Sequence, residues 1–255
     1  MDGPYGQADV RELAELLTGL GATPRTGMRY RRARAEPGTE TVLGTRFGAR
    51  PRLETIREAL RMLARHPATA AHLARKIAVH FVAEDPDPSL VAALETAWRD
   101  SGGNLAVVTG VLLAHPAAWE PTPRKVKPPF NFMVSALHAL GLAPGGLSAD
   151  QPRRQKRLLR APLERMGQEW ERPLGPDGWP EAAAAWITPP GVAGRIDWAM
   201  TAPEALMDQL PDPRDFARTA LGNALPEPVA FAARAAESRA EAIGVVLSSP
   251  TFQRR

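Results

Sequence analysis

The sequence predicts an all-α protein, an irregular multi-helix bundle of about ten to twelve short helices. Three observations predict it. Apolar residues recur every three or four positions along most of the 255-residue chain. Several of the 26 prolines directly follow an Asp, Thr or His, which is the arrangement of a helix start. Residues that favour strands are scarce, with two tyrosines beside repeated alanine runs.

The first half of the chain repeats this helix signal. Asp9, with a glutamate three residues later, resembles a capping box, so the first helix is expected to start there. Another helix is expected to open at Pro67, with Leu73, Ile77 and Phe81 as its apolar stripe. The same spacing predicts further helices within residues 53–63, 88–101, 105–112 and 130–140.

In the second half of the chain, capping residues predict where the helices start. Four capped starts are predicted, at Thr188, Thr201, Asp212 and Ser238. A shared turn also recurs along the whole chain, because "LARHPA", "LLAHPAAW" and "LSSPTF" each end an apolar helix and then present a His or Ser before a Pro. We interpret these three stretches as one type of connection between helices.

The domain organisation is expected to be a single helical domain over residues 1–255, which can divide into two lobes, 1–145 and 146–255. Residues 26–51 do not follow the helical pattern. Gly and Pro interrupt them, and "TVLG" is a short extended piece, so a long loop with room for a small hairpin is expected.

Composition excludes several classes of site. The chain has no cysteine, which removes disulfides, thiolate metal sites and cysteine nucleophiles. Its 32 Lys and Arg against 28 Asp and Glu give a net charge of +4, a weak argument for a polyanion partner. No signal peptide or transmembrane segment is found in the sequence, so the chain is expected to be soluble.

Two groups of side chains invite a catalytic interpretation. His72, Lys76 and His80 recur every four residues, but a cation between histidines two turns apart opposes metal binding. Ser135 and His138 lie three residues apart with no acid to orient them. We interpret both groups as helix-surface side chains. The acids of residues 84–88 are interpreted as a connection in which Asp87 caps the next helix, and no metal or cofactor is expected.

A basic cluster offers a different class of function. Arg153, Arg157 and Arg160 share one face of an expected helix, and such a row can follow phosphate groups. No aromatic residue interleaves with them, and Leu158 and Leu159 indicate an ordinary amphipathic helix. Weak binding of a polyanion or nucleic acid is therefore kept as an alternative.

Tryptophans gather in one segment, because four of the six fall within residues 168–198. Trp179 and Trp186 could form a stacking platform for a ligand, with Asp177 beside them. The competing interpretation, which we favour, is that both rings seal a gap between helical groups and that their indole N–H groups bond to backbone carbonyls.

Six stretches carry a resemblance to a known family. They are "HPATAAHLARKIAVHFVAEDP", "WRDSGG", "LLAHPAAW", "KVKPPFNFMVSALHALG", "GPDGWPEAAAAWITP" and "LSSPTFQRR". Their order is similar to that in the C-terminal part of the bacterial domain of unknown function 1800 family, so the family's usual N-terminal helical half is expected to be missing. The resemblance implies a mostly helical protein of unsettled activity. It also implies an exported sulfatase-fold protein as a partner and a periplasmic location, the alternative being the cytoplasm.

The long loop departs from the family pattern, which is similar to His-Asp-x-Gly-x-Lys-x-x-Leu-Gly. Ala35 stands at the position of the histidine and Glu40 at that of the lysine, so a metal-binding and an anion-binding side chain are replaced. Arg34 and Glu36 remain as candidate binding residues of this loop.

Two functions from different classes follow. The preferred one is a non-catalytic helical scaffold or binding module, because no common catalytic motif occurs in the sequence. The other is a hydrolase-like enzyme or enzyme fragment, with a site between the 26–51 loop and the Trp-rich 168–198 segment. That site would join Arg34 or Glu36 to Asp177 and Trp179.

Overall fold

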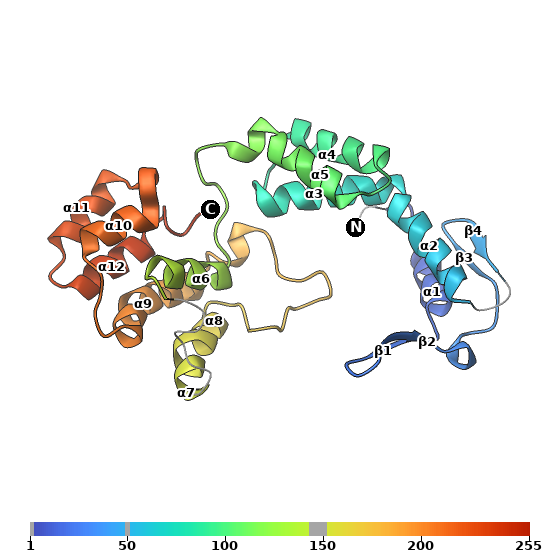
Figure 1. The fold of residues 1–255 in the computed structure, drawn as a ribbon, viewed down its shortest axis with the longest axis horizontal. Helices are drawn as coiled ribbons and strands as arrows, with labels where there is room; N and C mark the ends of the chain where they lie inside the picture. The colour runs from blue at the N-terminus through green and yellow to red at the C-terminus, as the bar shows by residue number, and fades with distance from the viewer. Residues whose placement is uncertain (1–2, 49–51, 143–151) are drawn as a thin grey trace. The chain divides into compact units, whose positions relative to one another are not determined.

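The structure, a computed structural model, describes residues 3–48, 52–142 and 152–255, which form two compact units (Figure 1). The first unit contains the described residues up to 81 together with 85–119, and the second contains 82–84 and those from 120 onward. Both are mostly helical, which confirms the predicted fold class. The expected lobe boundary after residue 145 lies outside the described residues and stays a prediction. Within the described ranges, no helix is long and apolar enough to cross a membrane.

The first unit combines helices with two small hairpins. Its elements are α1 (Gln7–Leu16), β1 (Leu20–Thr23), β2 (Gly27–Tyr30), η1 (Arg32–Arg34), β3 (Glu40–Val42), β4 (Thr45–Phe47), α2 (Leu53–Arg65), α3 (Pro67–Phe81), α4 (Pro88–Asp100), α5 (Leu105–Ala114) and η2 (Pro116–Trp119). The helices expected within residues 53–112 are therefore confirmed.

The predicted long loop contains more strand than expected. β3 and β4 pair antiparallel and turn through Leu43 and Gly44, which both have positive φ. This hairpin confirms the one expected around "TVLG". β1 and β2 form the first antiparallel hairpin of the chain, with Leu20 opposite Tyr30, and it begins before the expected start of the loop. The hairpin of β3 and β4 is called the second hairpin below.

The first helix starts earlier than predicted. α1 begins at Gln7, so Asp9 lies inside the first turn, and the prediction of a start at Asp9 is wrong. Its carboxylate accepts hydrogen bonds from the backbone N–H of Gly6 at 2.8 Å and of Leu43 at 2.7 Å. Both bonds favour the charged form and lower the pKa of Asp9, that from Gly6 most. One acid therefore caps α1 and holds the second hairpin against it.

The core of the first unit has a different composition from the one predicted. α3 buries Ala70, Ala74 and Ala78 where it packs against α4, while Phe81 of the expected stripe is 65% exposed. The stripe prediction is wrong for Phe81, while Leu73 and Ile77 are half-buried. The buried face carries alanines because small side chains let the two helices approach closely. A separate cluster of buried residues joins α1, the second hairpin and α2: Leu16, Val42, Phe47, Ile56 and Ala59.

The second unit is built around long-range helix contacts. Its elements are α6 (Pro129–Ala139), α7 (Pro152–Gln155), η3 (Lys156–Arg160), α8 (Ala161–Arg165), η4 (Ala183–Ala185), α9 (Pro189–Leu206), α10 (Pro213–Leu221), η5 (Gly222–Ala224), α11 (Glu227–Ala235) and α12 (Arg239–Ser248). Aromatic and aliphatic side chains of α6, α9, α10 and α12 form one continuous core, which includes Phe132, Trp198, Phe216 and Ile243. Trp198 donates its indole N–H to the Leu158 carbonyl at 2.7 Å.

Most of the predicted capped starts are confirmed. Thr188, Asp212 and Ser238 each accept a hydrogen bond from a backbone N–H of the first turn that follows. Thr201 does not start a helix, because α9 continues through it to Leu206 and its hydroxyl donates to the Asp197 carbonyl four residues back at 2.7 Å.

The recurring turn is capped by two kinds of side chain. Nδ1 of His66 accepts from the Ala68 N–H at 3.1 Å, and Nδ1 of His115 accepts from the Ala117 N–H at 3.2 Å. Ser249 accepts from a residue one position further along, the Phe252 N–H at 3.2 Å. The interpretation of these stretches as a shared connection is therefore confirmed, and each His or Ser caps the turn that follows.

Candidate ligand-binding sites

The predicted binding residues of the long loop lie in the first unit. Arg34 ends η1, and both Arg34 and Glu36 are exposed. The backbone N–H of Glu36 donates to the Thr18 hydroxyl at 2.7 Å, which fixes the path of the loop beside the end of α1. Asp177, Trp179 and Trp186 belong to the second unit. The predicted site that joins the two groups stays a prediction.

The tryptophan segment mixes packing with an exposed turn. Trp186 is 2% exposed, and its indole N–H donates to the Pro180 carbonyl at 3.1 Å. Its ring centroid lies 6.1 Å from that of the half-buried Trp179. Asp177 lies at the exposed tip of a tight turn, in which the Gly178 N–H donates to the Gly175 carbonyl. Because the Trp186 ring is buried, it cannot stack on a ligand and can only hold the neighbouring residues in place.

The predicted basic row lies on one irregular helical segment. Arg153 is on α7, while Arg157 and Arg160 are on η3, a short π-helical stretch that changes the spacing between successive turns. All three side chains are exposed. Polyanion binding by this row stays a prediction.

The other polar candidates do not form a catalytic arrangement among the described residues. His72 and Lys76 are exposed on α3, and the His80 ring lies edge-on to Phe81 at 4.7 Å. Ser135 and His138 on α6 share no hydrogen bond. Asp87 accepts from the Ser89 N–H at 2.7 Å, which confirms its predicted role as a cap. In the ranges that the structure covers, no three His, Cys, Asp or Glu side chains are grouped to hold a metal ion.

An apolar cavity of about 390 Å³ lies in the first unit, between α1, the second hairpin and the junction of α2 with α3. Its size falls at the low end of the range typical of small-molecule sites. Aliphatic side chains form most of its wall: Pro4, Val10, Leu13, Val42, Leu43, Leu63 and Leu73. The cavity therefore favours an apolar occupant.

Most polar groups of this cavity are already bonded to the protein. The two oxygens of Asp9 accept from separate backbone N–H groups. Thr69 donates its hydroxyl to the Leu63 carbonyl at 2.7 Å, and His66 uses Nδ1 for its cap. The exposed imidazole of His72 stands at the cavity with no hydrogen bond to the described residues. It is a polar group that an occupant can reach without displacing a hydrogen bond within the protein.

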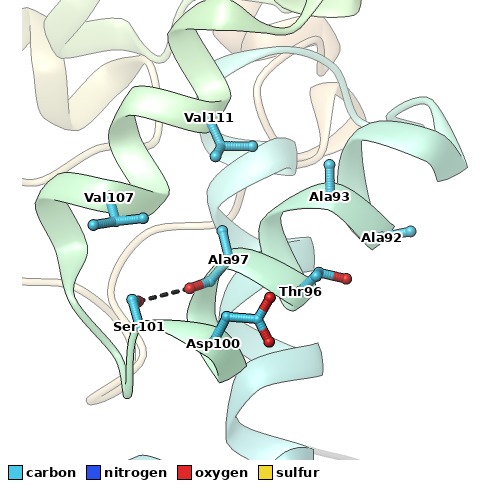
Figure 2. A pocket seen from close by; sticks show the side chains of 8 residues that line it. All are labelled: Ala92, Ala93, Thr96, Ala97, Asp100, Ser101, Val107 and Val111. Atoms are coloured by element: carbon cyan, nitrogen blue, oxygen red, sulfur yellow. Dashed lines mark hydrogen bonds between the residues drawn. The ribbon is translucent and has the colours of Figure 1, made fainter.

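A second, open hollow of about 700 Å³ lies between α4 and α5 (Figure 2). Its lining includes Ala92, Ala93 and Ala97 of α4 and Val107 and Val111 of α5. Thr96, Asp100 and Ser101 supply the oxygens at its edge, and the Ser101 hydroxyl donates to the Ala97 carbonyl at 2.6 Å. Small side chains produce this hollow, and its floor is apolar.

Buried cations distinguish the second unit. Residues 125–127 run antiparallel to 253–255, and the Lys127 N–H donates to the Gln253 carbonyl at 2.8 Å. Lys125 is 2% exposed, and its ammonium group forms an ion pair with Glu181. The Lys127 ammonium lies 4.1 Å from the centre of the Phe252 ring. Burial, helped by the positive charge of Arg255, lowers the pKa of Lys127 to about 8.

Arg195 of α9 is the second buried cation, at 2% exposed. Its Nη1 donates to the Gln253 side-chain oxygen at 2.6 Å, and its Nη2 donates to the Lys127 carbonyl at 2.7 Å. The guanidinium lies 5.4 Å from the centre of the Phe132 ring. Burial lowers the pKa of Arg195 to about 10. Arg195 also lines a cavity of about 240 Å³ together with Ser248.

The whole chain resembles one sequence family, described as "Protein of unknown function (DUF1800)", which matches it over residues 1–254. The chain belongs to the DUF1800 family. This confirms the resemblance drawn from the six stretches. No curated protein and no solved structure matches the chain.

Sequence reasoning missed the buried cations of this DUF1800 protein. A signal for one of them was present, because Gly191, Arg195, Trp198 and Ala202 recur at helical spacing and are all buried. An arginine on an otherwise small and apolar stripe indicates a buried charge. Lys125 gave no such signal, because its burial depends on pairing with the distant residues 253–255.

Proposed function

We propose that this DUF1800 protein is a non-catalytic binding module whose first unit holds a small, neutral, apolar molecule. The observation that supports the proposal most is the apolar cavity of about 390 Å³ in that unit. It is formed by side chains from α1, the second hairpin, α2 and α3, so that one occupant would contact four elements.

The polar groups around the cavity support binding over catalysis. A general acid or base must reach the substrate with a proton site that is not engaged elsewhere. Asp9 is held as a carboxylate by two backbone N–H groups, and His66 and Thr69 are engaged with the backbone. His72 has no hydrogen-bonded partner among the described residues that would orient it as a general acid or base, so it offers one polar contact at the rim. Such a site orients a ligand by one polar contact and binds it through its apolar surface.

A cavity-filling substitution tests the proposal. Ala68 lines the cavity on α3, so Ala68→Phe is expected to occupy the space of the ligand without removing any side-chain hydrogen bond. Binding of the neutral dye Nile red, followed by its fluorescence, is expected to fall at least about tenfold, because the buried contact area is lost.

The matched control is Ala71→Phe, three residues along the same helix and exposed. It adds the same ring outside the cavity and is expected to leave dye binding unchanged. Equal effects of the two variants, or no effect of either, would contradict the proposal. Turnover of an ester, phosphate or glycoside substrate that a point substitution in this chain abolishes would also overturn it.

A further inference from the structure

The charge of Arg195 has no acidic partner in the part of the chain that the structure describes. Its two Nη groups donate to neutral acceptors, the Gln253 amide and the Lys127 carbonyl. A buried guanidinium is costly unless an anion or a full set of hydrogen bonds compensates for the lost hydration. Glu181, the acid that pairs with a buried cation of this unit, is bonded to Lys125. The site thus carries uncompensated positive charge.

Two buried hydrogen-bond donors also lack acceptors. The Nε of Arg195 and the Oγ of Ser248 have no partner and are closed to bulk solvent. Buried polar atoms are nearly always bonded, so each exception requires an explanation. Arg195 and Ser248 come from α9 and α12, and both line the cavity of about 240 Å³. Both side chains therefore line one partly open cavity, and a ligand oxygen reaches these two atoms once the side chains turn toward it, because neither atom is open to a water molecule in this conformation.

The other residues that line this cavity indicate which type of ligand fits it. The same cavity is lined by five apolar residues: Val126, Ile187, Val192, Ile196 and Pro250. Arg254 lines it as well and adds a second positive charge. A matching molecule combines a small apolar body with one anionic end.

We propose that this cavity binds the carboxylate of a small aliphatic acid, and that the Arg195 and Ser248 side chains turn toward it so that the Arg195 Nε–H and the Ser248 hydroxyl donate to its two oxygens. A carboxylate has one charge and two oxygens, which suits one unpaired guanidinium N–H and one hydroxyl. A phosphate monoester carries more charge and needs more donors. The inference goes beyond the proposed function, because it concerns another unit and a charged ligand.

Side-chain NMR of the ¹⁵N-labelled full chain tests the proposal directly. Isovalerate is expected to shift the Arg195 Nε–H resonance in a saturable manner, because that hydrogen gains an acceptor. The neutral analogue 3-methyl-1-butanol, at the same concentration and ionic strength, is expected to leave it unchanged. N-acetylleucine distinguishes the source of the carboxylate, because tighter binding than isovalerate indicates a peptide C-terminus and weaker binding indicates a free acid.

Substitutions locate the ligand. Ser248→Ala removes a hydroxyl that has no partner in the protein, so it is expected to preserve the fold and weaken isovalerate binding about threefold to tenfold in ligand-observed saturation transfer. Arg195→Lys is expected to abolish binding, and the Ser248 variant keeps the test valid if Arg195→Lys does not fold. Arg165→Gln, an exposed charge on α8, is the control and is expected to change nothing.

Several outcomes would overturn the proposal. One is an Arg195 Nε–H resonance that does not respond to isovalerate. Another is equal binding of isovalerate and the alcohol. A third is a loss of affinity in Arg165→Gln as large as that in Ser248→Ala, because it would assign the effect to net charge. These results leave the dye site of the first unit untouched, since they concern a different cavity and probe.

Discussion

The two cavities of this protein differ in how their polar groups are satisfied. In the first unit, the cavity is lined by Asp9, His66 and Thr69, which form hydrogen bonds with the backbone. In the second unit, Arg195 and Ser248 each leave a donor unpaired. A cavity with bonded polar groups selects an apolar occupant, whereas one with unpaired donors selects an acceptor. The difference shows that the ligand a cavity selects depends on whether its polar lining atoms are already hydrogen-bonded, as well as on the residue types.

The two units also differ in how closely their helices pack around a glycine. Gly244 of α12 lies against α9, where an added Cβ would fall 2.2 Å from the Met200 sulfur and 3.2 Å from its Cα. Gly110 of α5 has open space around the corresponding position. The second unit therefore uses a glycine for close helix contact, and the first carries one on an exposed helix face.

The largest expected effect comes from Gly244→Ala. The added methyl group must displace Met200 and the α9 backbone beside it, so we expect a loss of about 2–3 kcal/mol in the free energy of unfolding. Urea denaturation followed by circular dichroism measures it.

Gly110→Ala is the matched control for that substitution. Alanine has the higher helix propensity and meets no neighbour at this position, so a gain of about 0.5–1 kcal/mol is expected. Equal destabilisation by both variants would show that Gly244 and Gly110 do not differ in how closely their neighbours pack.

A smaller effect, dependent on pH, is expected from Lys127→Met. The folded-state pKa of Lys127 is lowered to about 8, whereas that of an exposed lysine is 10.5. Between these values the unfolded chain binds a proton that the folded chain has lost, so this lysine makes the folded chain more stable as pH rises. Methionine does not titrate. The stability of wild type relative to Lys127→Met should therefore increase between about pH 8 and 10.5, by on the order of 1 kcal/mol given the partial exposure.

Urea denaturation of both proteins across this pH range checks the expectation. A difference that stays constant with pH would show that Lys127 titrates as an ordinary surface lysine. The cation cluster of the second unit would then be less desolvated than its burial indicates.

The smallest expected effect comes from Tyr30→Phe in the first unit. The Tyr30 hydroxyl is buried without a partner but does not line the apolar cavity. Its removal is expected to stabilise the chain by about 0.5 kcal/mol, because no hydrogen bond is lost and no polar group stays buried. A destabilisation in thermal unfolding would show that the hydroxyl has a partner, and it would weaken the same argument for Ser248.

Local signals in the sequence predicted the helices. Asp87, Asp212 and Ser238 cap helices that follow within a few residues, so a short window of sequence contains the cause. Where the cause lies elsewhere in the chain, the prediction is wrong, as at Thr201, where α9 continues because its buried face packs on α12. The alanine face of α3 shows the same dependence on a partner helix.

The candidate sites depended even more on distant residues. The unpaired donors of the second unit arise where α9 and α12 meet the strand-like pairing of residues 125–127 with 253–255. Nothing near Arg195 in the sequence reveals that Gln253 occupies one side of its guanidinium. The apolar cavity likewise needs the second hairpin to close against α1 and α3.

A crossed binding experiment tests the central claim most directly. Nile red and isovalerate are each titrated into the wild type, Ala68→Phe and Ser248→Ala. The two-cavity account predicts that Ala68→Phe weakens only the dye and that Ser248→Ala weakens only the carboxylate. Loss of both ligands in one variant, or of neither ligand in both variants, would contradict the assignment of separate apolar and carboxylate sites to the two units.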